Sequence, residues 1–171
     1  MEPWLYALIG IAALLVVFIA VILIRTANFK PKNNVKVIDE EEVFDGERAV
    51  ENLRELIRCK TVSYKDHSLE DDGEFEKLIS KLPELYPNVL KTCTLTRMED
   101  RALLFKWEGK EHDEASVLMA HYDVVPVNEE NWDKPPFEAI LEDGVVWGRG
   151  ALDTKVTFNG VLSAADHLIS K

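Results

Sequence analysis

An uncharged apolar run near the N-terminus is longer than most elements of a water-soluble domain. Leu5 to Ile24 comprises 20 residues without a charge. A helix rises about 1.5 Å per residue, so this run spans about 30 Å, the thickness of the hydrocarbon core of a bilayer. Trp4 and Tyr6 lie at one end and Arg25 follows the other, as expected of residues at a membrane interface. We therefore predict a single transmembrane anchor over residues 1–25.

Two other interpretations of this run stay open. A cleaved signal peptide would have a basic N-terminal region, a shorter apolar core and a cleavage site of small residues, whereas Met1-Glu2-Pro3 contains no Lys or Arg. A buried core helix would be shorter than this run. Basic residues flank only the C-terminal side of the run, so the positive-inside rule places the rest of the chain in the cytoplasm. These residues are Arg25, Lys30, Lys32 and Lys36.

Residues 26–45 form a charged segment that we interpret as a juxtamembrane linker. It contains the acidic run Asp39 to Glu42, which is typical of a solvated spacer, with an acidic partner-binding tract as the alternative. The chain has a net charge of −11 and no Lys/Arg cluster beyond the one beside the apolar run, which argues against nucleic acid as a partner. Cys59 and Cys93 do not form a CxxC pair and are expected to be free thiols.

Three segments of residues 46–171 contain apolar residues at helical spacing. They are Glu47–Arg58, Glu74–Leu82 and Thr157–Ile169. Pro83 and Pro87 are expected to end the second helix. The loop between the first two helices contains His67 and the acidic stretch Glu70 to Asp72, which we expect to be solvated.

Between the second and third helices the apolar pattern changes to that of β-strands. The expected strands are Val89–Thr96, Ala102–Trp107, Phe137–Leu141 and Val145–Trp147, the last two joined by an Asp-Gly turn. Ser116 to Ala120 is a short, continuous apolar run, which suits a strand in the middle of a sheet covered on both faces. Helices that alternate with strands predict a layered α/β domain.

Two short segments contain residues suited to binding a metal ion. His121 and Asp123 follow the apolar run, and residues two apart on an extended segment project to the same side. Asp153 lies within Gly148–Lys155, whose glycines permit a sharp turn. An imidazole is a good zinc ligand, and a carboxylate can orient that imidazole or bridge two metal ions. Each segment by itself also fits a surface histidine or an ordinary turn.

With their flanking sequences, the two segments resemble the zinc-dependent amidohydrolase and exopeptidase family. This family includes acetylornithine deacetylase, succinyl-diaminopimelate desuccinylase, aminoacylase and carboxypeptidase S. The matching residues are His121–Pro126, Trp132, Pro136-Phe137, Asp143-Gly144 and Gly148–Lys155, with Thr61–Ser63 similar to an early helix-to-loop junction. The likeness covers roughly residues 45–171. Val156 departs from the family pattern, in which Gly often follows the lysine.

The resemblance implies that residues 46–171 are the N-terminal part of a three-layer α/β/α zinc-exopeptidase-like catalytic domain. His121 would bind one zinc ion and Asp153 would bridge two, with cobalt or manganese as alternative metals. Asp123 would act in catalysis by orienting His121, and the peptide bond after Asp153 would be cis. The other ligands, the general-base glutamate pair and most of the lid domain that mediates homodimers are expected beyond Lys171. Neither His112 nor His167 is expected to be a ligand.

The activity implied by the resemblance is that of a metallopeptidase or N-acyl-amino-acid amidohydrolase. Such an enzyme cleaves an amide bond next to a free carboxylate in a small molecule or short peptide. Two ligands cannot complete a zinc site, so we expect this chain alone to be an inactive fragment. The alternative is a non-catalytic, membrane-tethered protein with at most a binding role.

The two indications of membrane topology disagree. The N-terminal anchor and the Asp153-Thr154-Lys155 sequence are closest to the carboxypeptidase S branch, which acts outside the cytosol. That resemblance implies an extracytoplasmic domain, whereas the basic residues after the apolar run imply a cytoplasmic one. The side of the membrane on which the domain lies is therefore left open.

Overall fold

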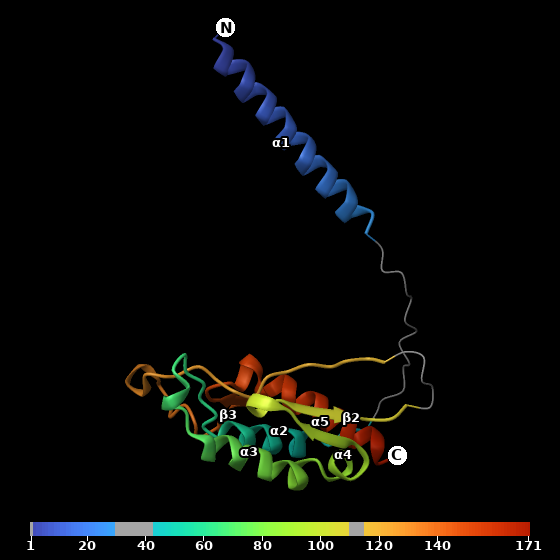
Figure 1. Cartoon of the computed structure of the whole chain (residues 1–171), viewed down its shortest axis with the longest axis vertical. Coiled ribbons are helices and arrows are strands. Elements are labelled where there is room, and N and C mark those ends of the chain that lie inside the picture. The colour runs from blue at the N-terminus through green and yellow to red at the C-terminus, as the bar shows by residue number, and fades with distance from the viewer. Residues whose placement is uncertain (1, 30–42, 110–114) are drawn as a thin grey trace. The chain divides into compact units, whose positions relative to one another are not determined.

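The computed structural model describes residues 2–29, 43–109 and 115–171 (Figure 1). The acidic run Asp39–Glu42 and His112 lie outside the described residues, as do Lys30, Lys32 and Lys36. The chain divides into two compact units, Met1–Glu42 and Val43–Lys171. Each unit is described separately below.

The first unit contains the helix α1 (Pro3–Ala27), which has 25 residues and none of them buried. Its apolar stretch has a mean hydropathy of 3.3. In the part of the chain that the structure describes, it is the one helix long and apolar enough to cross a membrane. A signal sequence meets the same criteria of length and composition, so α1 is compatible with both the anchor and the signal-peptide interpretations.

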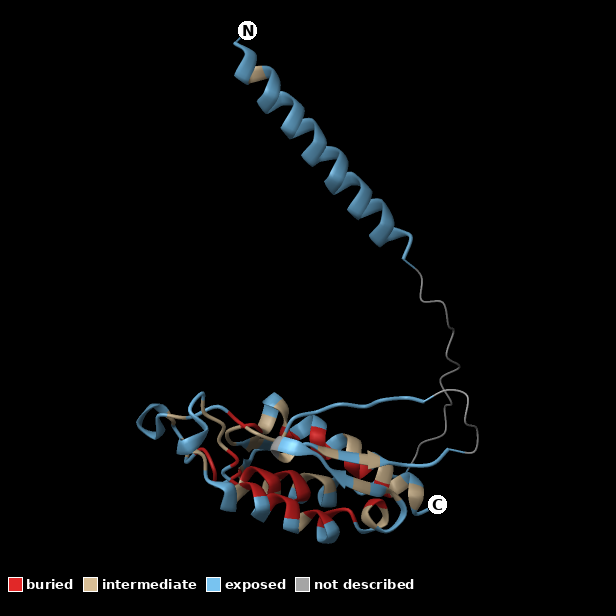
Figure 2. Ribbon diagram, in the orientation of Figure 1, coloured by how far each residue is buried: buried red, intermediate tan, exposed pale blue. Residues whose placement is uncertain are grey.

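The second unit is built around four helices, α2 (Gly46–Ile57), α3 (Asp72–Leu85), α4 (Pro87–Thr92) and α5 (Val156–Ile169). Buried residues gather on the faces that these helices turn toward one another (Figure 2). The core cluster contains Leu56, Leu78, Leu82, Leu85, Tyr86, Val89, Phe158 and Leu162. The three helices predicted from apolar spacing are therefore confirmed.

The prediction for the region around Pro83 was wrong in two respects. Helix α3 continues through Pro83 to Leu85, because a proline in the last turn removes only one backbone hydrogen bond and Leu82 and Leu85 keep that turn packed in the core. The segment after Pro87 is the helix α4 and not the start of a strand, so the following strand begins only at Thr94.

A buried carboxylate explains why α4 is helical. Pro87 occupies the first position of this helix, where its fixed backbone angle and missing N–H are tolerated. The next two backbone N–H groups, of Asn88 and Val89, donate to Asp166 Oδ1 at 2.7 and 3.0 Å. Asp166 lies on α5 and is 7% exposed. The cap comes from a residue 77 positions away, so local sequence patterns do not reveal it.

Two small antiparallel sheets complete the second unit. Strand β1 (Thr94–Arg97) pairs with β2 (Leu103–Lys106), with Thr94 opposite Lys106. Strand β3 (Ile140–Glu142) pairs with β4 (Val145–Trp147), and Asp143 and Gly144 between them have φ angles of 51° and 77°. Positive φ at both positions is the geometry of the predicted Asp-Gly hairpin turn. Helices mixed with strands confirm the α/β class.

The segment Ser116–Ala120 differs from the strand expected there. It is extended, but within the described residues no strand pairs with it, and Val117, Leu118 and Met119 are 75%, 73% and 83% exposed. A buried central strand needs hydrogen-bonded neighbours and a layer over each face. The ladder beside this segment consists of a single parallel bridge, Val62 to Val124, which lies after the apolar run.

Two glycines let the turn before α5 pack closely against the rest of the unit. This turn, η4 (Ala151–Lys155), follows Gly148 and Gly150. A Cβ atom on Gly148 would lie 2.6 Å from Cγ2 of Ile57, and one on Gly150 would lie 2.5 Å from Cγ1 of Val124. Gly150 also has a φ of 81°, which favours glycine. The sharp turn predicted here is confirmed at Gly150, whereas Gly148 is required by packing.

Replacing Gly150 by Ala should therefore destabilise the second unit by more than about 2 kcal/mol, because backbone strain adds to a clash with Val124. Gly144→Ala is the matched control, since Gly144 has a similar φ of 77° and nothing within 4 Å of its would-be Cβ. Its cost should be about 1 kcal/mol, from strain alone. The measurement is urea unfolding of the full chain in detergent, followed by tryptophan fluorescence. Equal losses in the two variants would contradict the close contact with Val124.

Candidate metal centre

The first candidate segment is held by the chain that follows α2. The Val124 N–H donates to the Thr61 carbonyl at 2.8 Å, and the Ser63 N–H donates to the Val124 carbonyl at 2.9 Å. The Thr61 hydroxyl, which is fully buried, donates to the Tyr122 carbonyl at 2.6 Å. These bonds fix the backbone on both sides of Asp123, at the residues one and three positions after His121.

His121 lies between the two candidate carboxylates. Its Nδ1 atom is 3.1 Å from both the carbonyl oxygen and Oδ1 of Asp123. Its Nε2 atom is 3.2 Å from Oδ1 of Asp153. The structure therefore brings together all three residues singled out in the sequence, although Asp153 is 32 positions away from His121. The side chains are 53%, 43% and 89% exposed for His121, Asp123 and Asp153, so solvent reaches each of them.

Asp153 projects from the turn η4. The peptide bond between Asp153 and Thr154 is cis, as expected from the resemblance. Both residues have non-helical backbone angles, and α5 begins at Val156. The carboxylate thus stands just before the N-terminus of a helix, on a kinked segment whose preceding Gly150 packs on Val124.

Lys155 attaches this turn to the end of α2. Its side chain is completely buried, and Nζ donates to the carbonyl oxygens of Leu56 at 2.8 Å and Cys59 at 2.7 Å. An ammonium group at the C-terminus of a helix is favourably placed, because the unpaired carbonyls there carry partial negative charge. Burial nevertheless lowers the pKa of Lys155 to about 8. Asp153 is thereby fixed relative to α2 through a residue two positions away.

A cleft of about 960 Å³ lies beside the candidate centre, with His121 and Asp123 in its wall. Another part of the wall is an ion-pair cluster. Glu70 accepts hydrogen bonds from the Tyr64 N–H at 3.0 Å and from Arg101 at 2.5 Å, and the Arg101 guanidinium lies 3.8 Å from the centre of the Phe75 ring.

The Glu70 side chain is 1% exposed, so the prediction that this loop is solvated was wrong for Glu70. The hydrogen bond from the Tyr64 N–H, followed by the one from Arg101, lowers the pKa of Glu70 to about 2. His67, by contrast, is 87% exposed, as predicted. A buried carboxylate with these donors keeps its charge and holds Arg101 in the wall of the cleft.

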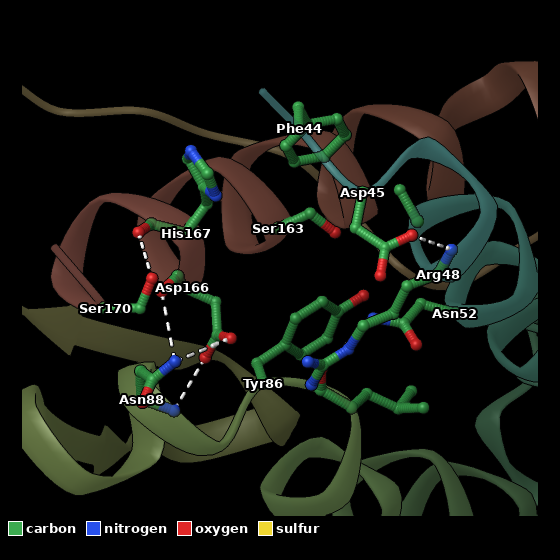
Figure 3. A pocket seen from close by; sticks show the side chains of 12 residues that line it. Phe44, Asp45, Arg48, Asn52, Tyr86, Asn88, Ser163, Asp166, His167 and Ser170 are labelled. Carbon is green, nitrogen blue, oxygen red and sulfur yellow. Dashed lines mark hydrogen bonds between the residues drawn. The ribbon is translucent and has the colours of Figure 1, made fainter. Parts of the chain in front are cut away.

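A second, smaller cavity of about 160 Å³ lies between the start of α2, the α3–α4 junction and the end of α5 (Figure 3). Its polar side chains are used in packing. Asp166 caps α4, and Asn52 donates to the Leu85 carbonyl at 3.1 Å. The Phe44 and His167 rings meet edge to face, 5.6 Å apart. We assign this cavity a structural role and the larger cleft the candidate functional one.

Within the described residues, no group of three or more His, Cys, Asp or Glu side chains could hold a metal ion. The donors that meet are one imidazole and two carboxylates, with one carboxylate on each side of the ring. Cys59 is buried and Cys93 is partly buried, and both are free thiols as expected.

The roles of Lys155 and Glu70 were not foreseen in the sequence. Lys155 stands directly before an apolar helical pattern, where a solvated residue would also be ordinary. Glu70 lies in a run of acidic residues whose members look alike in sequence, and its partner Arg101 is 31 positions away. No local signal identifies either residue.

Comparison with known proteins gives consistent matches. A family model described as Peptidase family M20/M25/M40 matches residues 117–171. The N-fatty-acyl-amino acid synthase/hydrolase PM20D1 of Xenopus tropicalis is 34% identical over 167 residues, which cover 92% of this chain and 32% of the relative. Carboxypeptidase S of Saccharomyces cerevisiae is 34% identical over 149 residues, which cover 81% of this chain and 26% of the relative.

The chain belongs to peptidase family M20/M25/M40. This confirms the resemblance inferred from His121–Pro126 and Gly148–Lys155, both of which lie in the matched region. A further relative, the probable carboxypeptidase S-like 2 of Dictyostelium discoideum, is 29% identical over 171 residues, which cover 96% of the chain and 32% of that protein. The chain thus spans about a third or less of the length of these M20/M25/M40 relatives.

Replacing Lys155 by Ala should destabilise the second unit by about 2 kcal/mol, because two hydrogen bonds from a charged donor are lost and a cavity is left beside α2. Lys91→Ala is the matched control, since Lys91 is exposed on α4. The measurement is again urea unfolding of the full chain in detergent. If the two variants lost the same free energy of unfolding, Lys155 would not be the attachment described above.

The depressed pKa of Glu70 predicts a pH dependence on the acid side. The pKa is about 2 in the folded chain and near its ordinary value of 4.5 when unfolded, so Glu70 stabilises the fold above about pH 4.5. This contribution is lost as the pH falls from about 4.5 to about 2. In Glu70→Gln the urea midpoint should vary less over this range than in the parent chain. Glu84→Gln, at an exposed position, should behave like the parent; identical profiles for all three proteins would refute the assignment.

Proposed function

We propose that this chain supplies the first ligands of a zinc-dependent hydrolase that cleaves an amide bond next to a free carboxylate. The observation that carries the proposal is the placement of His121 between two carboxylates, with Nδ1 against Asp123 and Nε2 facing Asp153 at 3.2 Å. Family membership supports hydrolysis, because the relatives named above are carboxypeptidases and an N-fatty-acyl-amino acid synthase/hydrolase.

Two of these side chains, His121 and Asp153, fit a zinc ion by the chemistry of their donors. Imidazole nitrogen and carboxylate oxygen are ordinary zinc ligands, and His121 and Asp153 offer one of each, open to solvent. We assign these two residues as ligands, with Asp153 able to reach two ions through its two oxygens. When bound, zinc would supply Lewis acidity toward water and toward the carbonyl of the scissile bond. Cobalt or manganese could take its place.

Asp123 acts through His121. We assign the tautomer in which Nδ1–H donates to the Asp123 carboxylate, 3.1 Å away, and Nε2 is unprotonated. This hydrogen bond would also fix the plane of the ring. The backbone bonds of Val124 hold Asp123 in place, so the direction of the Nε2 lone pair is set by the fold before any ligand arrives.

The cleft of about 960 Å³ beside His121 is large enough for a small molecule or the end of a short peptide. The substrate class is argued from the relatives, whose names refer to carboxypeptidase activity and to N-fatty-acyl-amino acids. A carboxypeptidase cleaves the amide bond next to a C-terminal carboxylate, and an N-fatty-acyl-amino acid also contains an amide bond close to a free carboxylate. Arg101 in the cleft wall is already paired with Glu70 and Asp72, so we do not assign it to substrate binding.

The proposal includes the organisation of the whole protein. Residues 1–25 would anchor it in a membrane, residues 26–45 would be a linker, and residues 46–171 would begin a three-layer α/β/α catalytic domain. The part of the relatives' sequences that this chain does not cover would supply the acid–base glutamate, the further zinc ligands and a homodimer contact. The non-catalytic alternative, a membrane-tethered protein with a binding role, makes the opposite prediction for zinc.

Zinc affinity tests the proposal without requiring activity. The full chain in detergent should bind zinc in a competition titration against a fluorescent chelator. His121→Ala and Asp153→Asn should each weaken binding more than tenfold, and Asp123→Asn by about tenfold, since outer groups typically contribute 10–100-fold.

His67→Ala is the control, because His67 is an exposed imidazole in the same cleft. It should bind zinc as the parent does. Equal affinity in the parent and in His121→Ala would contradict the proposal and favour the non-catalytic alternative. Loss of binding in His67→Ala would show that the ligand set is different from the one assigned here.

A further inference from the structure

Arg149 is the one arginine of the second unit whose side chain has no hydrogen-bond acceptor among the described residues. Its Nε atom is buried without a partner, and its guanidinium lies over the Trp132 ring, with Cζ 5.1 Å from the ring centre. Every other arginine of this unit donates to a glutamate or to a backbone carbonyl. These are Arg48, Arg54, Arg58, Arg97 and Arg101. The exception requires an explanation, because a chain with a net charge of −11 offers many carboxylates.

The backbone on both sides of Arg149 is fixed. Its N–H donates to the Pro136 carbonyl at 2.6 Å. Gly148 before it and Gly150 after it are packed too closely against neighbouring side chains to carry a Cβ atom. Contact with the face of Trp132 then restricts the side chain itself. The guanidinium is therefore held in place before any ligand binds, which lowers the entropic cost of binding.

Arg149 also lies close to the candidate metal centre along the chain. Asp153 follows four residues later, and four residues span at most about 14 Å when fully extended. The separation is shorter than this limit, because the chain between them curls and the Lys155 N–H donates to the Gly150 carbonyl at 2.9 Å. One amino acid unit of a ligand and the arginine side chain can together bridge such a distance.

The donors of Arg149 are open to a ligand at the end of the side chain. The side chain is only partly buried, and of its three nitrogen atoms Nε alone is both covered and unpaired. The two terminal nitrogens are therefore accessible. Contact with Trp132 explains where the guanidinium lies but leaves these donors unused. Two parallel N–H groups on a planar cation match the two oxygens of a carboxylate.

We propose that Arg149, supported by Trp132, binds the free carboxylate of the substrate. This assignment rests on the proposed function, which requires a group that recognises that carboxylate. Arg101 does not supply it, since it is paired with Glu70 and Asp72. Arg149 would fix the carboxylate while the neighbouring amide bond faces His121 and Asp153, and would thereby select for acids over their neutral analogues.

Two probes that differ only in the carboxylate test this role, N-acetylglycine and N-acetylglycinamide. The full chain in detergent, kept free of zinc by a chelator, is titrated with each probe, and binding is followed by the relaxation of the acetyl methyl protons. The acid should bind about tenfold more tightly than the amide. In the chain labelled with ¹⁵N-arginine, the acid should shift the Nε–H signal of Arg149, which is assigned by its absence from Arg149→Lys.

Arg149→Lys keeps the charge but not the two parallel donors, so it should lose most of the tenfold preference for the acid. Arg97→Lys is the matched control, because the Arg97 guanidinium is exposed and already paired with Glu76. It should keep the preference of the parent. His121→Ala should also keep it, since no zinc is present, and Arg149→Lys should bind zinc as the parent does. A failure of the proposed zinc site would thus be seen separately.

Three results would overturn the assignment. The first is equal affinity of the parent for the acid and the amide, or binding of the acid that appears only after zinc is added, which would place the carboxylate on the metal. The second is an unchanged preference in Arg149→Lys together with a loss of stability, which would identify Arg149 as a packing residue. The third is an Arg149 Nε–H signal that stays in place when the acid is bound.

Discussion

The ammonium group of Lys155 is the contact on which the arrangement of the candidate centre depends. It lies fully buried between the carbonyl oxygens of Leu56 and Cys59 and joins the turn before α5 to the end of α2. Burying an ammonium group is unfavourable unless its donors are satisfied, and burial lowers its pKa here to about 8. This contact links two parts of the chain almost 100 residues apart, and Asp153 is two residues from it.

The same end of α2 also positions the other candidate segment. The segment after α2 pairs through Thr61 and Ser63 with Val124. His121 and Asp123 are therefore held by the same end of α2 to which Lys155 attaches. Gly150 then brings the turn against the Val124 side chain, where any Cβ would clash. The 3.2 Å separation between His121 and Asp153 is thus a consequence of packing around one helix terminus.

Local patterns predicted most of the elements but few of the contacts between them. The apolar stripe of α3 and the Asp143-Gly144 turn follow from residue spacing and backbone preference, which neighbouring residues determine. Helix α4 was missed because its cap is Asp166, far along the chain, and the buried charge of Glu70 was missed because its partner Arg101 is distant. The three candidate site residues were singled out by a family pattern that places them together, whereas spacing alone favoured a surface histidine or an ordinary turn.

The most direct test of the candidate centre is X-ray absorption spectroscopy at the zinc edge on the full chain loaded with one equivalent of zinc. Coordination by His121 and Asp153 predicts a single imidazole nitrogen and oxygen neighbours, all at about 2.0–2.2 Å, with no sulfur. A shell at about 2.3 Å would indicate thiolate from Cys59 or Cys93, and scattering from several imidazoles would indicate other histidines. Either of these results would contradict the assignment of the two residues as the metal ligands of this chain.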